Sequence, residues 1–204
     1  MSELPITPNP PEKPLSPGVV VLGRFQPFHL GHASLLNAAN KWRCEKAPSL
    51  TLIIAIGSSN RDESLKNPWS AEERSEMIEA WLSEMDMHNV EVVPIPDIED
   101  PPNWVAHAEN YHGSAGVFFT SDAPSAELYE DAGWEVQKTL LENRESFEGW
   151  RVRETARMLS TIGDEEAVME ILSQTVPSVV VEYLVRNDAL RRLAFLREGG
   201  EPVG

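Results

Sequence analysis

Two histidines three residues apart, His29 and His32, are the side chains of this sequence best suited to chemistry. They follow a short apolar run, residues 18–23, and lie in the string GRFQPFHLGH together with Arg24 and Pro27, which stiffens the loop. Because the string opens a predicted helix, its first backbone N–H groups and the helix dipole favour an anion there. The imidazoles and the guanidinium would add donors aimed at the same anion, which makes the loop a positive cradle. No nucleophile is obvious, so the pattern predicts direct in-line transfer with stabilisation of the charge that grows on a phosphoryl group.

Two glycines of the same string support this interpretation. Gly23 would let the backbone come close to a ligand, and Gly31 would leave room for a base or a phosphate against the helix. A His-x-x-His pair by itself is common and would also suit a metal or arise by chance, whereas the longer string is much less expected by accident. The remaining histidines, His88, His107 and His112, have no acid or cysteine pattern that completes a zinc site, so we expect them on the surface or in the packing.

Composition excludes several classes of protein. The 204 residues carry a formal net charge of −16, which argues against general nucleic-acid binding but allows a local site for a small anion. The sequence has neither an apolar stretch of membrane-spanning length nor the pattern of a signal peptide, so we expect no membrane association and a cytoplasmic location. The single cysteine, Cys44, excludes an internal disulfide. Residues 1–17 hold six of the 16 prolines and predict a flexible tail, followed by one domain over residues 18–204.

The elements that must position the histidines alternate along the chain. Short apolar runs predict strands, and amphipathic stretches between them predict helices; the strands are expected at residues 18–23, 50–57, 90–96, 116–121 and 134–138, and the helices at 31–43, 70–85, 103–111 and 124–133. This order indicates an α/β fold with three α/β/α layers around a parallel sheet of about five strands. From about residue 148 the chain is expected to be helical, although the valines of residues 177–185 would suit a strand equally. In such sheets ligands bind beyond the carboxyl ends of the strands, which is where GRFQPFHLGH lies.

The same string resembles the signature of the HxGH nucleotidyltransferase superfamily. Residues 54–78, 96–109 and 118–136 extend the resemblance, which is closest to the archaeal-type nicotinamide mononucleotide adenylyltransferases and covers roughly residues 18–160. It implies a Rossmann-like fold and an enzyme that transfers AMP from ATP to nicotinamide mononucleotide, forming NAD and pyrophosphate. It also implies Mg²⁺ with the ATP, held by phosphate oxygens and water with no protein ligand to name. A tendency of the family to form rings suggests a homo-oligomer.

The resemblance also assigns roles to individual residues. His29 and His32, with Arg24, would contact the ATP phosphates and act in catalysis. The other residues implied to bind the nucleotides are Gly23, Phe25 and Gly31 at the first strand, Gly57, Ser58 and Ser59 at the second, Asn67, Pro68 and Trp69 beside the mononucleotide with Arg74 in support, Asp97, Asn103 and Trp104 around the pyridine, and Arg153 at the phosphates. A flat pyridinium cation can stack on the indole of Trp104, whereas spacing alone would make this residue a packing residue of a helix.

One motif departs from the family. Its second phosphate motif, Ile-Ser-x-Thr-x-x-Arg, aligns with residues 147–153, where Glu148 replaces the serine and Trp150 replaces the threonine. A glutamate there would repel a triphosphate unless it turns to solvent, and a shifted register would use Thr155 and Arg157 instead. Two alternatives therefore stay open: another nucleotidyl transfer of the HxGH type, to pantetheine phosphate, flavin mononucleotide or a phospho-alcohol, and a nucleotide-binding protein with reduced turnover.

Overall fold

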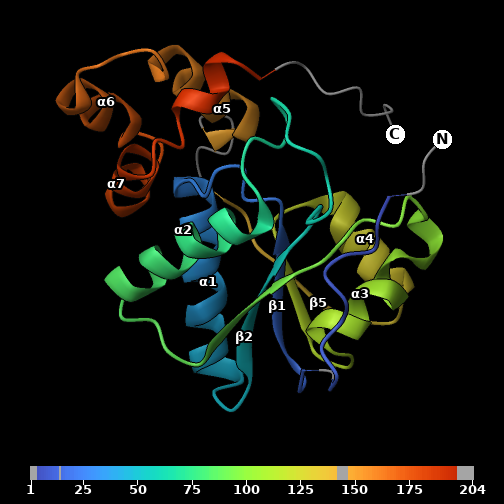
Figure 1. The fold of residues 1–204 in the computed structure, drawn as a ribbon. Coiled ribbons are helices and arrows are strands. Elements are labelled where there is room, and N and C mark those ends of the chain that lie inside the picture. The colour runs from blue at the N-terminus through green and yellow to red at the C-terminus, as the bar shows by residue number, and fades with distance from the viewer. Residues whose placement is uncertain (1–3, 14, 142–146, 197–204) are drawn as a thin grey trace. The chain divides into compact units, whose positions relative to one another are not determined.

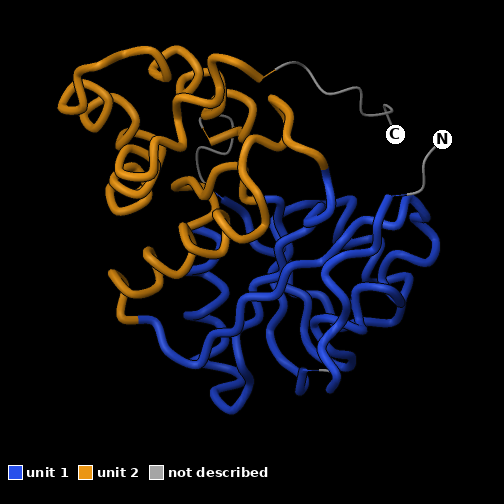
Figure 2. Tube along the Cα trace, viewed as in Figure 1, with its two compact units in different colours: residues 1–24, 34–61, 87–142 blue, residues 25–33, 62–86, 143–204 orange. Residues whose placement is uncertain are grey.

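The chain divides into two compact units. The computed structural model describes residues 4–13, 15–141 and 147–196. One unit contains residues 1–24, 34–61 and 87–142, and the other contains residues 25–33, 62–86 and 143–204 (Figure 2).

The first unit is built on a parallel sheet. Its five strands lie in the order β3-β2-β1-β4-β5 (Figure 1). Their bounds are Gly18–Gly23 for β1, Thr51–Ile56 for β2, Val90–Pro94 for β3, Val117–Thr120 for β4 and Glu135–Lys138 for β5. All four neighbouring pairs are parallel, as the alternation of elements predicted.

Helices cover both faces of this sheet. Helix α1 (Leu30–Lys46) places Trp42 against Phe119 of β4, with 6.2 Å between the ring centroids. Phe118 of β4 points to the other face, where it stacks on Tyr129 of α4 (Ala123–Asp131) at 3.7 Å. Helix α3 (Trp104–His112) packs in the same apolar cluster as α4 through Val105, Ala108 and Tyr111. The predicted three-layer Rossmann-like α/β fold is confirmed.

Strands β1, β2 and β3 end next to one another, and each leads into a segment with predicted site residues. The N–H of Gly57, just after β2, donates to the carbonyl of Gly23 at 3.0 Å, and the N–H of Ser59 donates to Ile95 after β3 at 3.1 Å. The segments that start with Arg24, Gly57 and Ile95 therefore leave the sheet at one edge, which is the position where ligands of parallel sheets bind.

The second unit is helical. It contains α2 (Ala71–Glu84), α5 (Gly149–Leu159), α6 (Glu165–Leu172), α7 (Ser178–Arg186) and a 3₁₀ turn at Arg191–Ala194, together with residues 30–33 from the start of α1. Helix α2 begins with a capping box, in which the side chain of Ser70 accepts from the N–H of Glu73 and the side chain of Glu73 accepts from the N–H of Ser70. The valine-rich segment left open above is helix α7, because its apolar residues recur at helical spacing and Val180, Val181 and Leu184 are buried.

The N-terminal residues that the structure describes make hydrogen bonds within the first unit. The carbonyl of Pro5 accepts from Asn60 Nδ2 at 2.9 Å, and the carbonyl of Pro8 accepts from Tyr111 Oη at 2.9 Å. The division into a flexible tail and one following domain stays a prediction. No helix in the described part of the chain is both long and apolar enough to cross a bilayer.

Candidate functional site

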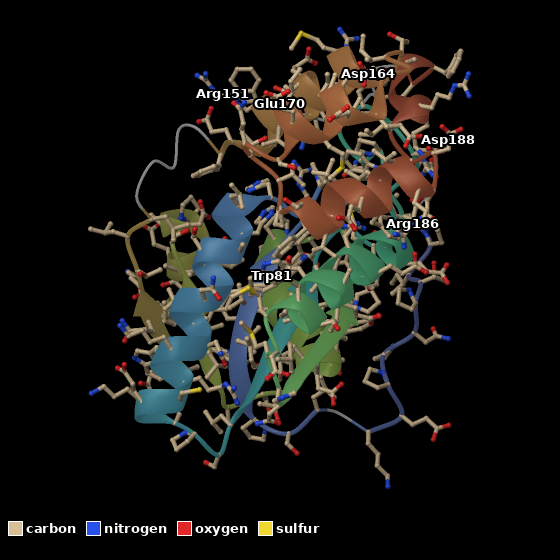
Figure 3. The ribbon with its side chains drawn as sticks, turned by 90° about the vertical axis from the view of Figure 1, so that its left-hand side faces the viewer. Trp81, Arg151, Asp164, Glu170, Arg186 and Asp188 are labelled. Atoms are coloured by element: carbon tan, nitrogen blue, oxygen red, sulfur yellow. The ribbon has the colours of Figure 1, made fainter. Side chains whose placement is uncertain are left out.

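The loop after β1 brings His29 and His32 into direct contact. Their rings stack with 3.6 Å between centroids, and Phe25 packs the edge of its ring against His32 at 4.7 Å. Phe28 continues this aromatic cluster to Trp81 of α2, with 5.0 Å between the ring centroids. Figure 3 labels Trp81 on this helix. Phe25, implied above to line the nucleotide site, has a buried side chain that packs against the second imidazole, and its role at the nucleotide stays a prediction.

Backbone hydrogen bonds determine which ring nitrogen carries the proton. The N–H of His29 donates to Nδ1 of His32 at 3.3 Å, and the N–H of His32 donates to Nδ1 of His29 at 3.4 Å. Because each Nδ1 accepts, we assign the proton of each neutral imidazole to Nε2. The start of α1 thus carries Nε2–H donors, which suits a site for phosphate oxygens, and the ring of His32 also makes a hydrogen bond with the backbone of Pro27.

The histidines are neutral in this arrangement, which corrects the expectation of a positive cradle formed by imidazoles. Burial, and next the positive charge of Arg153, lower the pKa of His29 to about 4. Burial and the neighbouring ring of His29 lower the pKa of His32 well below its ordinary value. Positive charge in this group comes from Arg153, whose Nη1 donates to the carbonyl of Gln26 at 2.9 Å.

The lowered pKa values predict a dependence of stability on pH. Between pH 6.5 and 4 the unfolded chain binds the proton of His29 and the folded chain does not, so stability is lost as the pH falls through this window. His29 alone is expected to remove roughly 3 kcal/mol of unfolding free energy over that range, and His32 acts in the same direction. Urea denaturation at a series of pH values measures this. The His29→Asn variant should lose clearly less unfolding free energy over this pH range than the wild-type chain, and the control variant His88→Asn should lose as much as the wild-type chain. Equal losses in all three proteins would contradict the lowered pKa of His29.

The glycines near the histidines are packed against the protein. A Cβ on Gly31 would lie 2.9 Å from Cβ of Phe147 and 3.1 Å from the ring of His29. The space expected for a ligand at Gly31 is thus filled by the chain itself. A Cβ on Gly149 would lie 3.2 Å from Nη1 of Arg153 and 3.9 Å from Nε2 of His29, so the start of α5 faces the same donors.

The residues that depart from the second phosphate motif have partners of their own. The carboxylate of Glu148 accepts from Nε1 of Trp150 at 2.8 Å and from Nε of Arg151 at 3.2 Å. The guanidinium of Arg151 (labelled in Figure 3) also lies over the indole of Trp150, 4.9 Å from its centroid. The charge of Glu148 is therefore balanced on its own helix, which weakens the reason for expecting reduced turnover.

A cavity of about 330 Å³ lies beside Arg153 in the second unit. Its lining includes the cations Lys66, Arg153 and Arg157, with the indole of Trp150 and the carboxylate of Glu154, which lies 3.7 Å from Nε of Arg157. Arg157, considered above for a shifted register, thus shares a cavity with the arginine of the unshifted motif. Three cationic side chains around one cavity can hold several phosphate oxygens.

Residues 67–69, which were implied to lie beside the mononucleotide, are buried in the second unit. The side chain of Gln26 makes two hydrogen bonds with the main chain of the buried Trp69: its Nε2 donates to the carbonyl at 2.7 Å, and its Oε1 accepts from the N–H at 3.1 Å. The indole Nε1 of Trp69 donates to the carbonyl of Ala189 at 3.1 Å. Asn67 and Arg74 are also buried. The hydrogen-bonding role of Gln26 was missed from the sequence because it depends on residues more than 40 positions away.

The first unit contains the other group of predicted residues around a second cavity, of about 360 Å³. Trp104 and Asp97 line it, together with Leu22, Arg61, Glu99, Asp100, Pro101 and Leu128. Asn103 does not line the cavity but donates to Asp100 at 2.8 Å. An indole beside carboxylates is a suitable surface for a flat cation.

Arg61 is the basic residue of this cavity, and sequence reasoning missed it. Its Nε donates to Asp97 at 2.7 Å and its Nη1 donates to Glu99 at 3.0 Å. Burial alone would lower the pKa of Arg61, but the hydrogen bonds and charges of these two carboxylates raise it above the ordinary value. Its position between two implied site segments was the only signal in the sequence.

The remaining implied residues lie at the carboxyl edge of the sheet. Ser58 is buried with φ of 53°, and Ser59 donates through its hydroxyl to the carbonyl of Thr7 at 3.5 Å. Arg24 is exposed directly after β1. These residues and Gly57 are in the first unit, whereas the histidines and Arg153 are in the second.

The donor set around the histidines fits phosphate better than a bare metal ion. In the described ranges no group of three or more His, Cys, Asp or Glu side chains is placed to hold a metal. Imidazole Nε2–H and guanidinium groups donate to anionic oxygens and do not ligate cations in these protonation states.

Comparison with known proteins agrees with these features. Residues 20–146 match the model of the cytidylyltransferase-like family. The chain is 31% identical over 173 residues to the nicotinamide-nucleotide adenylyltransferase of Saccharolobus solfataricus, covering 84% of this chain and 91% of that protein. It is 32% identical over 176 residues to the enzyme of the same name from Ignicoccus hospitalis, covering 85% and 94%.

A solved structure supports the fold. The bifunctional NMN adenylyltransferase/ADP ribose pyrophosphatase of Francisella tularensis, complexed with AMP and a manganese ion, superposes with a TM-score of 0.60 at 20% identity. The match covers 88% of this chain and 52% of that one, so the chain spans about half the length of that protein.

Proposed function

Because the chain belongs to the nicotinamide-nucleotide adenylyltransferases of the cytidylyltransferase-like family, we propose that it transfers AMP from ATP to nicotinamide mononucleotide, forming NAD and pyrophosphate. The observation that carries the proposal is the stacked pair of His29 and His32 at the start of α1, with both protons on Nε2. Two neutral donors at a helix N-terminus bind phosphate oxygens and stabilise charge that develops on them.

The reaction is a direct displacement. An oxygen of the mononucleotide phosphate attacks the α-phosphorus of ATP, and the bond between this phosphorus and the oxygen that bridges to the β-phosphorus breaks. The electron pair leaves with pyrophosphate, so no protein nucleophile is needed. The Nε2–H groups of His29 and His32 donate to phosphate oxygens of ATP, and Arg153 neutralises part of the leaving charge together with Lys66 and Arg157.

The ATP is expected to enter with Mg²⁺. Bound to the polyphosphate, the ion would neutralise part of its charge, and phosphate oxygens and water would hold it, since the protein side of this site is made of N–H donors. The protein contributes by orienting both substrates, which removes much of the entropic barrier of a bimolecular step.

The mononucleotide is assigned to the cavity of Trp104. Its pyridinium ring stacks on the indole, and Asp97 contributes negative charge beside it.

Self-association of the chain is a further expectation, which sedimentation velocity would test.

Replacing Trp104 by alanine is expected to raise KM for nicotinamide mononucleotide by about 10–30-fold, because a desolvated cation–π contact contributes about 2 kcal/mol. The KM for ATP should change little. Steady-state kinetics with each substrate varied in turn measures this, and Trp104→Phe should recover part of the loss. A larger effect on ATP than on the mononucleotide would contradict the assignment.

A product assay tests the function itself. ATP and Mg²⁺ are incubated with nicotinamide mononucleotide, phosphopantetheine, flavin mononucleotide or a phospho-alcohol, and the products are separated by chromatography with pyrophosphate measured in parallel. We expect NAD and equimolar pyrophosphate with the first acceptor. Preferential reaction with another acceptor would favour a different nucleotidyl transfer, and tight ATP binding without pyrophosphate would favour a binding protein.

A further inference from the structure

The guanidinium of Arg192 joins the 3₁₀ turn at Arg191–Ala194 to the segment before α2, and both belong to the second unit. Its Nη1 donates to the carboxylate of Glu73 at 2.9 Å, to the carbonyl of Pro68 at 3.2 Å and to the carboxylate of Glu63 at 3.3 Å. Its Nη2 donates to the other carboxylate oxygen of Glu73, which makes this pair bidentate. The carboxylate of Glu73 also accepts from the N–H of Ser70 at 2.8 Å. One rigid fork of donors therefore holds residues 63–68 against the first turn of α2.

Between these contacts the chain forms a closed turn that carries Lys66. The N–H of Ser64 donates to the carbonyl of Asn67 at 3.2 Å, and the N–H of Asn67 donates to the carbonyl of Ser64 at 3.1 Å. Leu65 and Lys66 are the two residues at the tip of this turn, and both line the cavity of Arg153. Ser64 and Asn67 are buried whereas Lys66 is exposed, so the base of the turn is fixed and its tip carries the cation.

The residues beside Arg192 contact the same part of the chain. The carbonyl of Ala189 accepts from the indole of Trp69 at 3.1 Å, and Leu193, which is 2% exposed, lines the cavity with Lys66. Arg192 itself is not among the described residues that line this cavity, and the carboxylates that bind it balance its charge. Arg192 can therefore affect a ligand of the cavity through the turn that it holds.

We propose that Arg192 is a positioning residue for ATP, which places the ammonium group of Lys66 in the cavity that Arg153 and Arg157 also line. Lysine is a point charge on a flexible stem, so the position of its charge depends on the backbone that carries it. A turn that is fixed before ATP arrives lowers the entropic cost of ordering this cation against the polyphosphate. This inference rests on the proposed function.

A double-mutant cycle in the full chain tests the proposal, with steady-state kinetics for ATP and for nicotinamide mononucleotide. Lys66→Ala is expected to lower kcat/KM for ATP by about tenfold and Arg192→Ala by about three- to tenfold, with little change in KM for the mononucleotide. The double variant should lose no more than Lys66→Ala alone, because Arg192 acts through Lys66. Arg192→Lys should recover part of the loss, since it keeps the charge but not the fork of donors.

The matched control is Arg191→Ala in the same 3₁₀ turn. Arg191 is exposed and lies 4.0 Å from the carboxylate of Asp188 (labelled in Figure 3), so this variant should keep the wild-type kcat/KM. Thermal denaturation reports whether each variant is folded, and Arg192→Gln, which keeps a polar side chain, replaces Arg192→Ala in the cycle if the alanine variant does not fold.

Two results would overturn the inference while the proposed function stands. One is a double variant in which the losses of the two single variants multiply, and the other is an Arg192 variant that is folded and keeps the wild-type kcat/KM for ATP or raises KM equally for both substrates. No formation of NAD by the wild-type chain would overturn the proposed function and this inference with it.

Discussion

Replacing His29 by alanine is expected to lower kcat by about 10²–10³-fold, the range typical for removal of one preorganised donor to a developing negative charge. The donor is Nε2–H, because Nδ1 accepts from the backbone of His32. A neutral imidazole whose pKa is about 4 donates without first losing or gaining a proton at pH 7. The effect should therefore appear in kcat more than in KM for either substrate.

The fold of the variant must be checked alongside its rate. His29 is 6% exposed and stacks on His32, so its removal leaves a small void in the packing. Circular dichroism and thermal denaturation report on this, and His29→Gln keeps a donor in a similar volume. The matched control His88→Ala should keep the wild-type rate. A His29→Ala protein that is folded and retains full kcat would show that this imidazole has no role in the transition state.

Replacing Arg153 by alanine is expected to lower kcat/KM for ATP by about 10–100-fold, since charge-assisted hydrogen bonds contribute about 1.5–3 kcal/mol. Arg153 is the positive charge nearest to His29 that also lines the cavity of Lys66 and Arg157. Arg153→Lys should recover part of the loss, because the charge is kept and the fork of donors is not.

A charge of the same helix provides the control for Arg153. Arg151 pairs with Glu148 on α5 and is not part of the cavity lining, so Arg151→Ala should change kcat/KM less than threefold, roughly the effect of a surface charge. Steady-state kinetics at fixed ionic strength compares the two variants. Equal losses of kcat/KM in both variants would mean that Arg153 contributes only to the overall positive charge of α5 and makes no specific contact with ATP.

The architecture was predictable from local patterns. The runs 51–56 and 117–120 are apolar on both faces because helices cover both sides of the sheet, and this makes them readable as strands without any knowledge of their neighbours. The capping box at Ser70 and Glu73 marked the start of α2 in the sequence, because its hydrogen bonds join residues only three positions apart. Helix α7 was ambiguous because β-branched residues suit strands, and its burial pattern decided for the helix.

The chemical state of the site was not predictable from local patterns. Neutrality of His29 depends on burial and on Arg153, which is more than 120 positions away, and no spacing rule reports either. The partners of Glu148 and the ion pairs of Arg61 depend on side-chain directions in the folded chain. The sequence thus indicated which residues were candidates, while packing decided their protonation and their partners.

The most direct test of in-line adenylyl transfer follows two labels. ATP labelled with ³²P at either the α- or the γ-phosphorus is incubated with Mg²⁺, nicotinamide mononucleotide and the wild-type chain, and the products are separated. Displacement at the α-phosphorus predicts that the α-label appears in NAD and the γ-label in pyrophosphate, in equal amounts, with both slowed to the same extent by His29→Ala. Transfer of the γ-label to the mononucleotide, or release of the α-label as free AMP without NAD, would contradict it.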